Sequence, residues 1–117
     1  MDIKRGYERK NLKIYLQAFD MKTNQIFGYI VDITKEGIML TREQGVEIDD
    51  DFQLRVVLPA EIDGKKEFSF SAKSRWSAKD SESEFYNIGM QFINLSPSDL
   101  QIIENLIQDF CFDTDTE

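Results

Sequence analysis

Residues 25–41 read QIFGYIVDITKEGIMLT, and this stretch decides the fold class. Residues 25–33 and 38–41 are rich in β-branched and aromatic side chains, which favour strands. The polar residues 34–37 between them are typical of a tight turn, and Gly37 suits a position with positive φ. The sequence therefore predicts two antiparallel strands joined by a turn at residues 34–37.

Four further segments carry strand signals on either side of this hairpin. Alternation of apolar and polar residues predicts one strand that begins at Leu12 and three others over residues 52–58, 66–78 and 85–95. We expect Pro59 to end the strand over 52–58, because proline supplies no N–H to a sheet. The pair Asp63-Gly64 predicts a hairpin turn.

The strand over residues 66–78 also gives an expectation for the core. Its apolar positions share one phase, so they should face the same side; they are Phe68, Phe70, Ala72 and Trp76. We therefore expect Trp76, like Phe92 in the last strand, to pack in the core rather than to contact a ligand.

One segment near the C-terminus reads as a helix. Ser96 suits the N-cap and Pro97 the first helical position. Apolar residues then recur at steps of three and four, which predicts an amphipathic helix of about 14 residues packed on the sheet. The fold class predicted is all-β dominated, a small six-stranded antiparallel β-barrel with a C-terminal α-helix.

The composition excludes several kinds of chemistry. The chain has 117 residues, one cysteine, no histidine and a net charge of −8. An internal disulfide, a Cys/His zinc site and Ser-His or Cys-His nucleophiles are therefore impossible. No group of carboxylates stands out, so we expect neither enzyme activity nor a metal. An acidic protein is also expected to bind DNA or RNA poorly.

The chain shows neither a membrane-spanning apolar run nor an apolar segment behind its basic N-terminus, so we expect a soluble cytoplasmic protein. We divide it into a flexible basic arm (1–11), a barrel with its helix (12–111) and an acidic tail (112–117). Residues 1–13 hold five basic and two acidic side chains. This basic segment is either a solubilising terminus or a local anion site.

Two short motifs favour the anion site, and a third supports a family resemblance. Arg5 and Arg9 form an R-x-x-x-R pattern just before the first strand. Residues 32–37 fit D/N-x-S-x-x-G at the turn after the second strand, with Thr34 in place of serine, and residues 88–92 read IGMQF. In this order and on this frame, the motifs resemble the PilZ domain, a bacterial receptor domain for cyclic di-GMP. The resemblance covers nearly the whole chain.

The resemblance implies a role for each motif residue. Arg5 and Arg9 would contact guanine edges and phosphates, because a guanidinium binds both in a planar fork. Asp32 would accept hydrogen bonds from guanine N–H groups, and Thr34 would offer its hydroxyl. Gly37 would be needed for the tight turn rather than for contact with the ligand. Lys4 stands where many members have a further arginine, and it would add positive potential.

Other roles remain open for two of these residues: Asp32 can cap the turn, and Thr34 can be an ordinary strand-end residue.

The resemblance also implies partners. Cyclic di-GMP would be the ligand, with no other cofactor, and its binding would order the N-terminal arm. The complex would signal to a protein of motility, pilus or exopolysaccharide machinery, as a monomer or weak homodimer. One alternative is a degenerate module of the same fold that binds no nucleotide and acts through protein contacts. A small-barrel enzyme or RNA-binding barrel is disfavoured by the missing histidine and the acidic charge.

Overall fold

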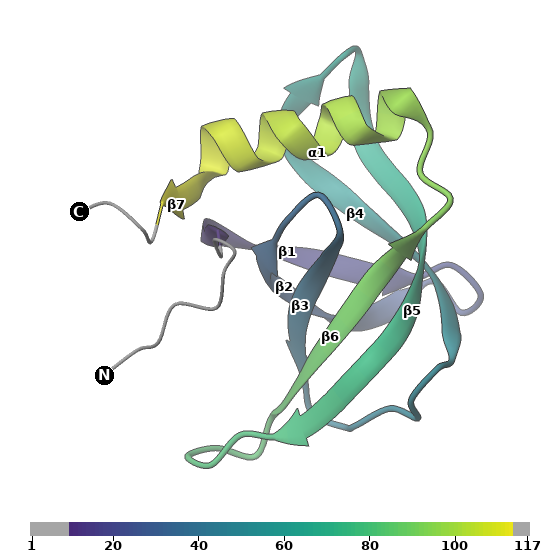
Figure 1. Cartoon of the computed structure of the whole chain (residues 1–117), viewed down its shortest axis with the longest axis vertical. Helices are drawn as coiled ribbons and strands as arrows, with labels where there is room; N and C mark the ends of the chain where they lie inside the picture. The colour runs from purple at the N-terminus through teal and green to yellow at the C-terminus, as the bar shows by residue number, and fades with distance from the viewer. Residues whose placement is uncertain (1–9, 114–117) are drawn as a thin grey trace.

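The computed structural model describes residues 10–113, with side chains from Tyr15 to Phe110. Seven strands and one helix follow one another along the chain (Figure 1). Their bounds are β1 Lys10–Asp20, β2 Gln25–Ile33, β3 Gly37–Arg42, β4 Asp51–Ile62, β5 Lys65–Lys79, β6 Tyr86–Ile93, α1 Pro97–Phe110 and β7 Cys111–Asp113.

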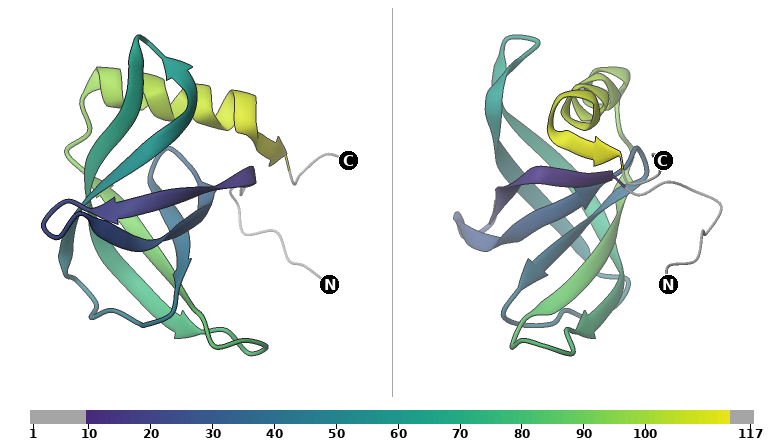
Figure 2. Two further views of the ribbon diagram at one scale, coloured as in Figure 1. Left: turned by 180° about the vertical axis from the view of Figure 1, so that it is seen from behind. Right: turned by 90° about the vertical axis from the view of Figure 1, so that its left-hand side faces the viewer.

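Six antiparallel strands close into a barrel. The order is β2-β3-β6-β5-β4-β1, and β1 also pairs with β2, which completes the ring (Figure 2). The short strand β7 pairs with the beginning of β1, where Leu12 lies opposite Cys111. The end of β1 pairs instead with β4, where Ala18 lies opposite Val56. The predicted six-stranded barrel with a C-terminal helix is therefore confirmed.

The core lies inside the barrel and under the helix. Strands β1 to β6 send apolar side chains inward, and the fully buried ones include Ile30, Leu40, Leu54 and Ile88. Helix α1 lies across one end of the barrel (Figure 1) and adds Ile102, Ile103 and Leu106 to the same cluster. The helix therefore covers one end of the barrel.

Several predicted local features are confirmed. Strand β2 has the predicted bounds. Asp63 and Gly64 both have positive φ, 53° and 76°, as the hairpin turn between β4 and β5 requires. Helix α1 begins at Pro97, and the Ser96 Oγ accepts a hydrogen bond from the Asp99 N–H at 3.1 Å.

Two expectations about β4 and β5 are wrong. Strand β4 continues past Pro59 to Ile62. Its pairing with β5 is irregular between Val57 and Ile62, so the strand does not need an N–H donor at Pro59. Trp76 is not in the core: its residue is 44% exposed. A register shift between Ser74 and Trp76 reverses the alternation of β5, so Ser74 faces inward and Trp76 outward.

Candidate functional site

The turn between β2 and β3 is built by Thr34. Its N–H donates to the Gly37 carbonyl at 2.9 Å. Its Oγ1 accepts hydrogen bonds from the N–H groups of Glu36 at 3.1 Å and Gly37 at 3.2 Å. A hydroxyl that binds two backbone donors holds the turn in one conformation. Thr34 is therefore more than an ordinary strand-end residue.

Gly37 is needed for a close approach between strands. Among the described residues, Gly64 has a positive φ and Gly37 does not. The expectation that Gly37 occupies a position with positive φ is therefore wrong. A Cβ atom at Gly37 would overlap the Met90 carbonyl oxygen and lie 3.1 Å from the carbonyl carbon. Strand β6 thus approaches the turn so closely that only glycine fits at this position.

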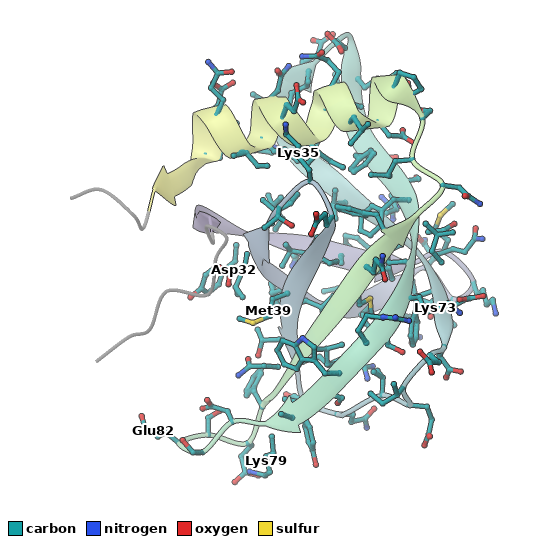
Figure 3. All side chains as sticks on the ribbon, viewed as in Figure 1. Asp32, Lys35, Met39, Lys73, Lys79 and Glu82 are labelled. Atoms are coloured by element: carbon teal, nitrogen blue, oxygen red, sulfur yellow. The ribbon has the colours of Figure 1, made fainter. Side chains whose placement is uncertain are left out.

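Asp32 lies on the outer surface of the barrel, whereas Ile30 and Ile33 of the same strand face the core. The pairing of β2 with β3 shifts between Ile30 and Asp32, so Asp32 lies opposite Met39. On its other side, Asp32 lies opposite Asn11 of β1. Directly paired residues of antiparallel strands share a face, and Figure 3 shows Asp32 and Met39 on the same side of the sheet. Asp32 is nevertheless only 6% exposed.

The same row continues to an aromatic side chain. Met39 lies opposite Gly89 of β6, and Gly89 lies opposite Trp76 of β5. The indole covers Gly89 so closely that a Cβ there would overlap Trp76 Nε1 and lie 2.8 Å from its Cδ1. We call Asp32, Met39, Gly89 and Trp76 the outer row. With a spacing of 4.8 Å between strands, it extends for roughly 14 Å.

Met39 and Trp76 are not predicted as site residues from the sequence. The signal available for Trp76 was Gly89, since glycine inside a strand often marks a close approach of another group. The regular alternation of β5 hid this relation, because it placed Trp76 on the core side. Trp76 shares a face with Asp32 only because of the register shift in β5, and the sequence does not reveal that shift.

The motif turn also contacts the helix. Lys35 Nζ lies 3.3 Å from Glu104 Oε2 of α1, and Figure 3 shows Lys35 directed toward the helix. The Phe92 N–H donates to the Glu36 carbonyl at 2.9 Å, which ties the turn to β6. The turn is thus held by both its neighbouring strand and the helix.

The structure brings together three of the six predicted site residues. Asp32, Thr34 and Gly37 lie at the end of β2 and in the turn to β3. Lys4, Arg5 and Arg9 lie outside the described residues. Within residues 10–113, no group of three potential metal ligands occurs, and no helix is long and apolar enough to span a membrane.

The outer row combines groups that suit a flat polar ligand. A carboxylate accepts hydrogen bonds at one end, and a half-exposed indole offers its face at the other. The Met39 thioether lies between them as a polarisable apolar contact. An aromatic base that carries N–H donors would use all three.

Comparisons with known proteins agree with this geometry. The family model for the PilZ domain matches residues 3–112. A comparison with curated proteins gives no match. The fold resembles the PilZ domain of YcgR from Escherichia coli, solved with c-di-GMP, with 17% identity and a TM-score of 0.64 over 91% of this chain and 90% of that one.

Two longer solved proteins have the same fold in part. The Bacillus subtilis inhibitor of motility MotI/DgrA aligns with a TM-score of 0.69 and 16% identity over 92% of this chain. MrkH from K. pneumonia, in complex with c-di-GMP, aligns with 0.68 and 17% over 92%. This chain spans about half of each, 50% and 52%. From the family match over residues 3–112 and the barrel with its motif turn, we conclude that this chain belongs to the PilZ domain family.

Proposed function

We propose that this protein is a receptor for cyclic di-GMP rather than an enzyme, and that it binds the nucleotide on the outer row. The observation that carries the proposal is the placement of Asp32 on the outer surface, in one row with Met39 and Trp76. The fold of a PilZ domain solved with c-di-GMP supports it.

Asp32 would recognise guanine. A carboxylate accepts hydrogen bonds only, and guanine presents two neighbouring donors, N1–H and the N2 amino group. Because Asp32 is only 6% exposed, its bonds to a base would form where water competes weakly. Adenine lacks this pair of donors, so Asp32 would also provide base specificity.

Thr34 would bind an acceptor of the ligand. Its oxygen already accepts from two N–H groups, and its O–H reaches the Gly37 carbonyl only at 3.4 Å. The hydroxyl hydrogen is therefore the group that Thr34 can offer, and a phosphate oxygen or guanine O6 would accept it.

The arginines of the N-terminal motif can reach the outer row through the chain itself. Asn11 lies opposite Asp32, and Arg9 precedes Asn11 by two residues. Two peptide units span at most about 7 Å between Cα atoms, and six units, from Arg5, span about 21 Å. Arg5 and Arg9 would contact phosphate and guanine edges, and Lys4 would add positive potential.

Trp76 would close the site at its far end. An exposed indole packed on a glycine presents a flat apolar surface, on which a purine can stack. In the complex, the part of the arm that precedes β1, residues 1–9, would become ordered and change the surface offered to a protein partner, as expected for a cytoplasmic signalling domain.

A titration calorimetry experiment with cyclic di-GMP tests the proposal, with GTP as the control ligand. We expect the unaltered protein to bind, and Arg9→Ala to weaken binding about 10- to 100-fold through loss of a bidentate contact. Lys66→Ala, at an exposed position of β5, is the charge-matched control. Its affinity for cyclic di-GMP should equal that of the unaltered protein.

Two results would contradict the proposal. If the folded protein releases no heat with cyclic di-GMP at several temperatures, the chain is a module that acts through protein contacts alone. If Arg9→Ala and Lys66→Ala have equal affinities, the arginine motif is not part of the site. Amide exchange of residues 1–11, with and without nucleotide, tests the ordering of the arm separately.

A further inference from the structure

The outward position of Trp76 depends on an irregularity in β5. Ser74 lies opposite Met90, and Trp76 lies opposite Gly89, so the two partners are adjacent in β6 whereas Arg75 is an extra residue in β5. This extra residue is a β-bulge, and bulges redirect side chains. Regular pairing through this region would turn the indole toward the core.

Ser74 anchors the loop before β4 to this bulge. It is fully buried, and its Oγ donates to the Glu47 carbonyl at 2.6 Å and accepts from the Asp50 N–H at 3.0 Å. Its backbone accepts from the Asp49 N–H at 2.8 Å and donates to the Asp50 carbonyl at 2.9 Å. A buried hydroxyl with this many partners fixes the local backbone.

The same loop is also bound on the other side of Trp76. The Val46 N–H donates to Ser77 Oγ at 3.2 Å. At the bulge itself, Arg75 pairs with Asp49, whose φ is 67°, at 3.1 Å. Residues 46–50 therefore contact three residues of β5 around Trp76: Ser74 before the bulge, the bulge residue Arg75, and Ser77 after Trp76.

We propose that Ser74 and Ser77, through their bonds to residues 46–50, are positioning residues that keep Trp76 on the outer row for nucleotide binding. The ligand part rests on the proposed function; the position of Trp76 does not. The bonds before and after Trp76 hold the register shift in place, since a bulge without them can move to a neighbouring residue. Residues 46–50 thereby control the nucleotide affinity without contacting the nucleotide.

Trp76 reports its own position, because it is the only tryptophan of the chain. The experiment measures its emission maximum and its acrylamide quenching without nucleotide, and then the affinity for cyclic di-GMP. Ser74→Ala and Ser77→Ala are the test variants, and Ser69→Ala, at an exposed position of β5, is the matched control. Ser77→Thr keeps the hydroxyl at the half-buried position and should restore the unaltered behaviour.

We expect altered quenching in Ser74→Ala and Ser77→Ala, with affinities lowered about tenfold. Ser69→Ala and Ser77→Thr should match the unaltered protein in both measurements. Ser77→Ala removes a bond from a half-buried residue and is the variant to rely on if Ser74→Ala does not fold.

The two measurements separate this inference from the proposed function. Unchanged quenching in folded Ser77→Ala and Ser74→Ala overturns the positioning role, whatever the affinities are. Altered quenching with unchanged affinity overturns the link between Trp76 and the nucleotide. If the unaltered protein binds no nucleotide, the proposed function fails, and altered quenching alone then supports the positioning of Trp76.

Discussion

Gly37 combines a local and a long-range constraint in one residue. It ends the motif turn, and its α-hydrogen side faces the Met90 carbonyl of β6, where a Cβ would overlap the oxygen. We expect Gly37→Ala to lower the free energy of unfolding by about 1–3 kcal/mol, since backbone must move to admit the methyl group. Urea unfolding measures this change.

Gly45→Ala is the control for this prediction. A Cβ at Gly45 meets side-chain atoms of Ser77 and Tyr86 at 3.1–3.2 Å, which side chains can relieve more easily than backbone. Gly37→Ala should therefore be the more destabilising of the two. Equal stabilities would show that β6 can move away from the turn at little cost.

The hydroxyl of Thr34 gives a second prediction, about the stability of the turn. Thr34→Val keeps the shape but leaves two N–H groups of the turn without their acceptor, at a cost of about 1–2 kcal/mol in thermal or urea unfolding. Thr34→Ser retains the hydroxyl and should remain close to the unaltered stability. If valine and serine behave alike, the hydroxyl does not hold the turn.

The site residues differ in how far sequence can predict them. Asp32, Thr34 and Gly37 lie within six residues of one another, so the resemblance of one short motif to the family pattern names all three together. Trp76 joins them only through pairings across β3 and β6 and a bulge bound to residues 46–50. Alternation along one strand contains no information about such distant partners.

At the scale of elements, helix α1 depends on a reciprocal cap. Ser96 Oγ accepts from the Asp99 N–H, and Asp99 Oδ2 accepts from the Ser96 N–H, both at 3.1 Å. We expect Ser96→Ala to destabilise the protein by about 1 kcal/mol. Ser69→Ala, at an exposed position of β5, is the matched control, and equal melting temperatures of the two variants would contradict this role of the cap.

Strand β4 shows why element bounds were only partly predictable. Pro59 was expected to end the strand, yet β4 continues to Ile62 and turns back at Asp63-Gly64 into β5. The pairing with β1 involves residues 54–56 only, so Pro59 lies beyond the part of β4 that has strands on both sides. A missing N–H is tolerated there, and the sequence does not show where a partner strand ends.

The whole molecule places the proposed site on the outside of a closed barrel. The strands close through the β1–β2 pairing, and α1 covers one end, so the buried side chains are already packed without a ligand. Binding on the outer row would therefore add contacts to a folded protein rather than complete its core. Ligand stabilisation should follow mass action alone.

Thermal unfolding with nucleotide tests this expectation for the intact chain. At a concentration about 100 times its Kd, cyclic di-GMP should stabilise the fold by about 2.7 kcal/mol. For a domain of 117 residues this corresponds to a rise in melting temperature on the order of 10 °C. At the same nucleotide concentration, Arg9→Ala should show a much smaller rise, and GTP should have little effect on either protein. A large rise with GTP, or an equal rise in Arg9→Ala, would mean that the stabilisation comes from anion binding unrelated to the arginine motif.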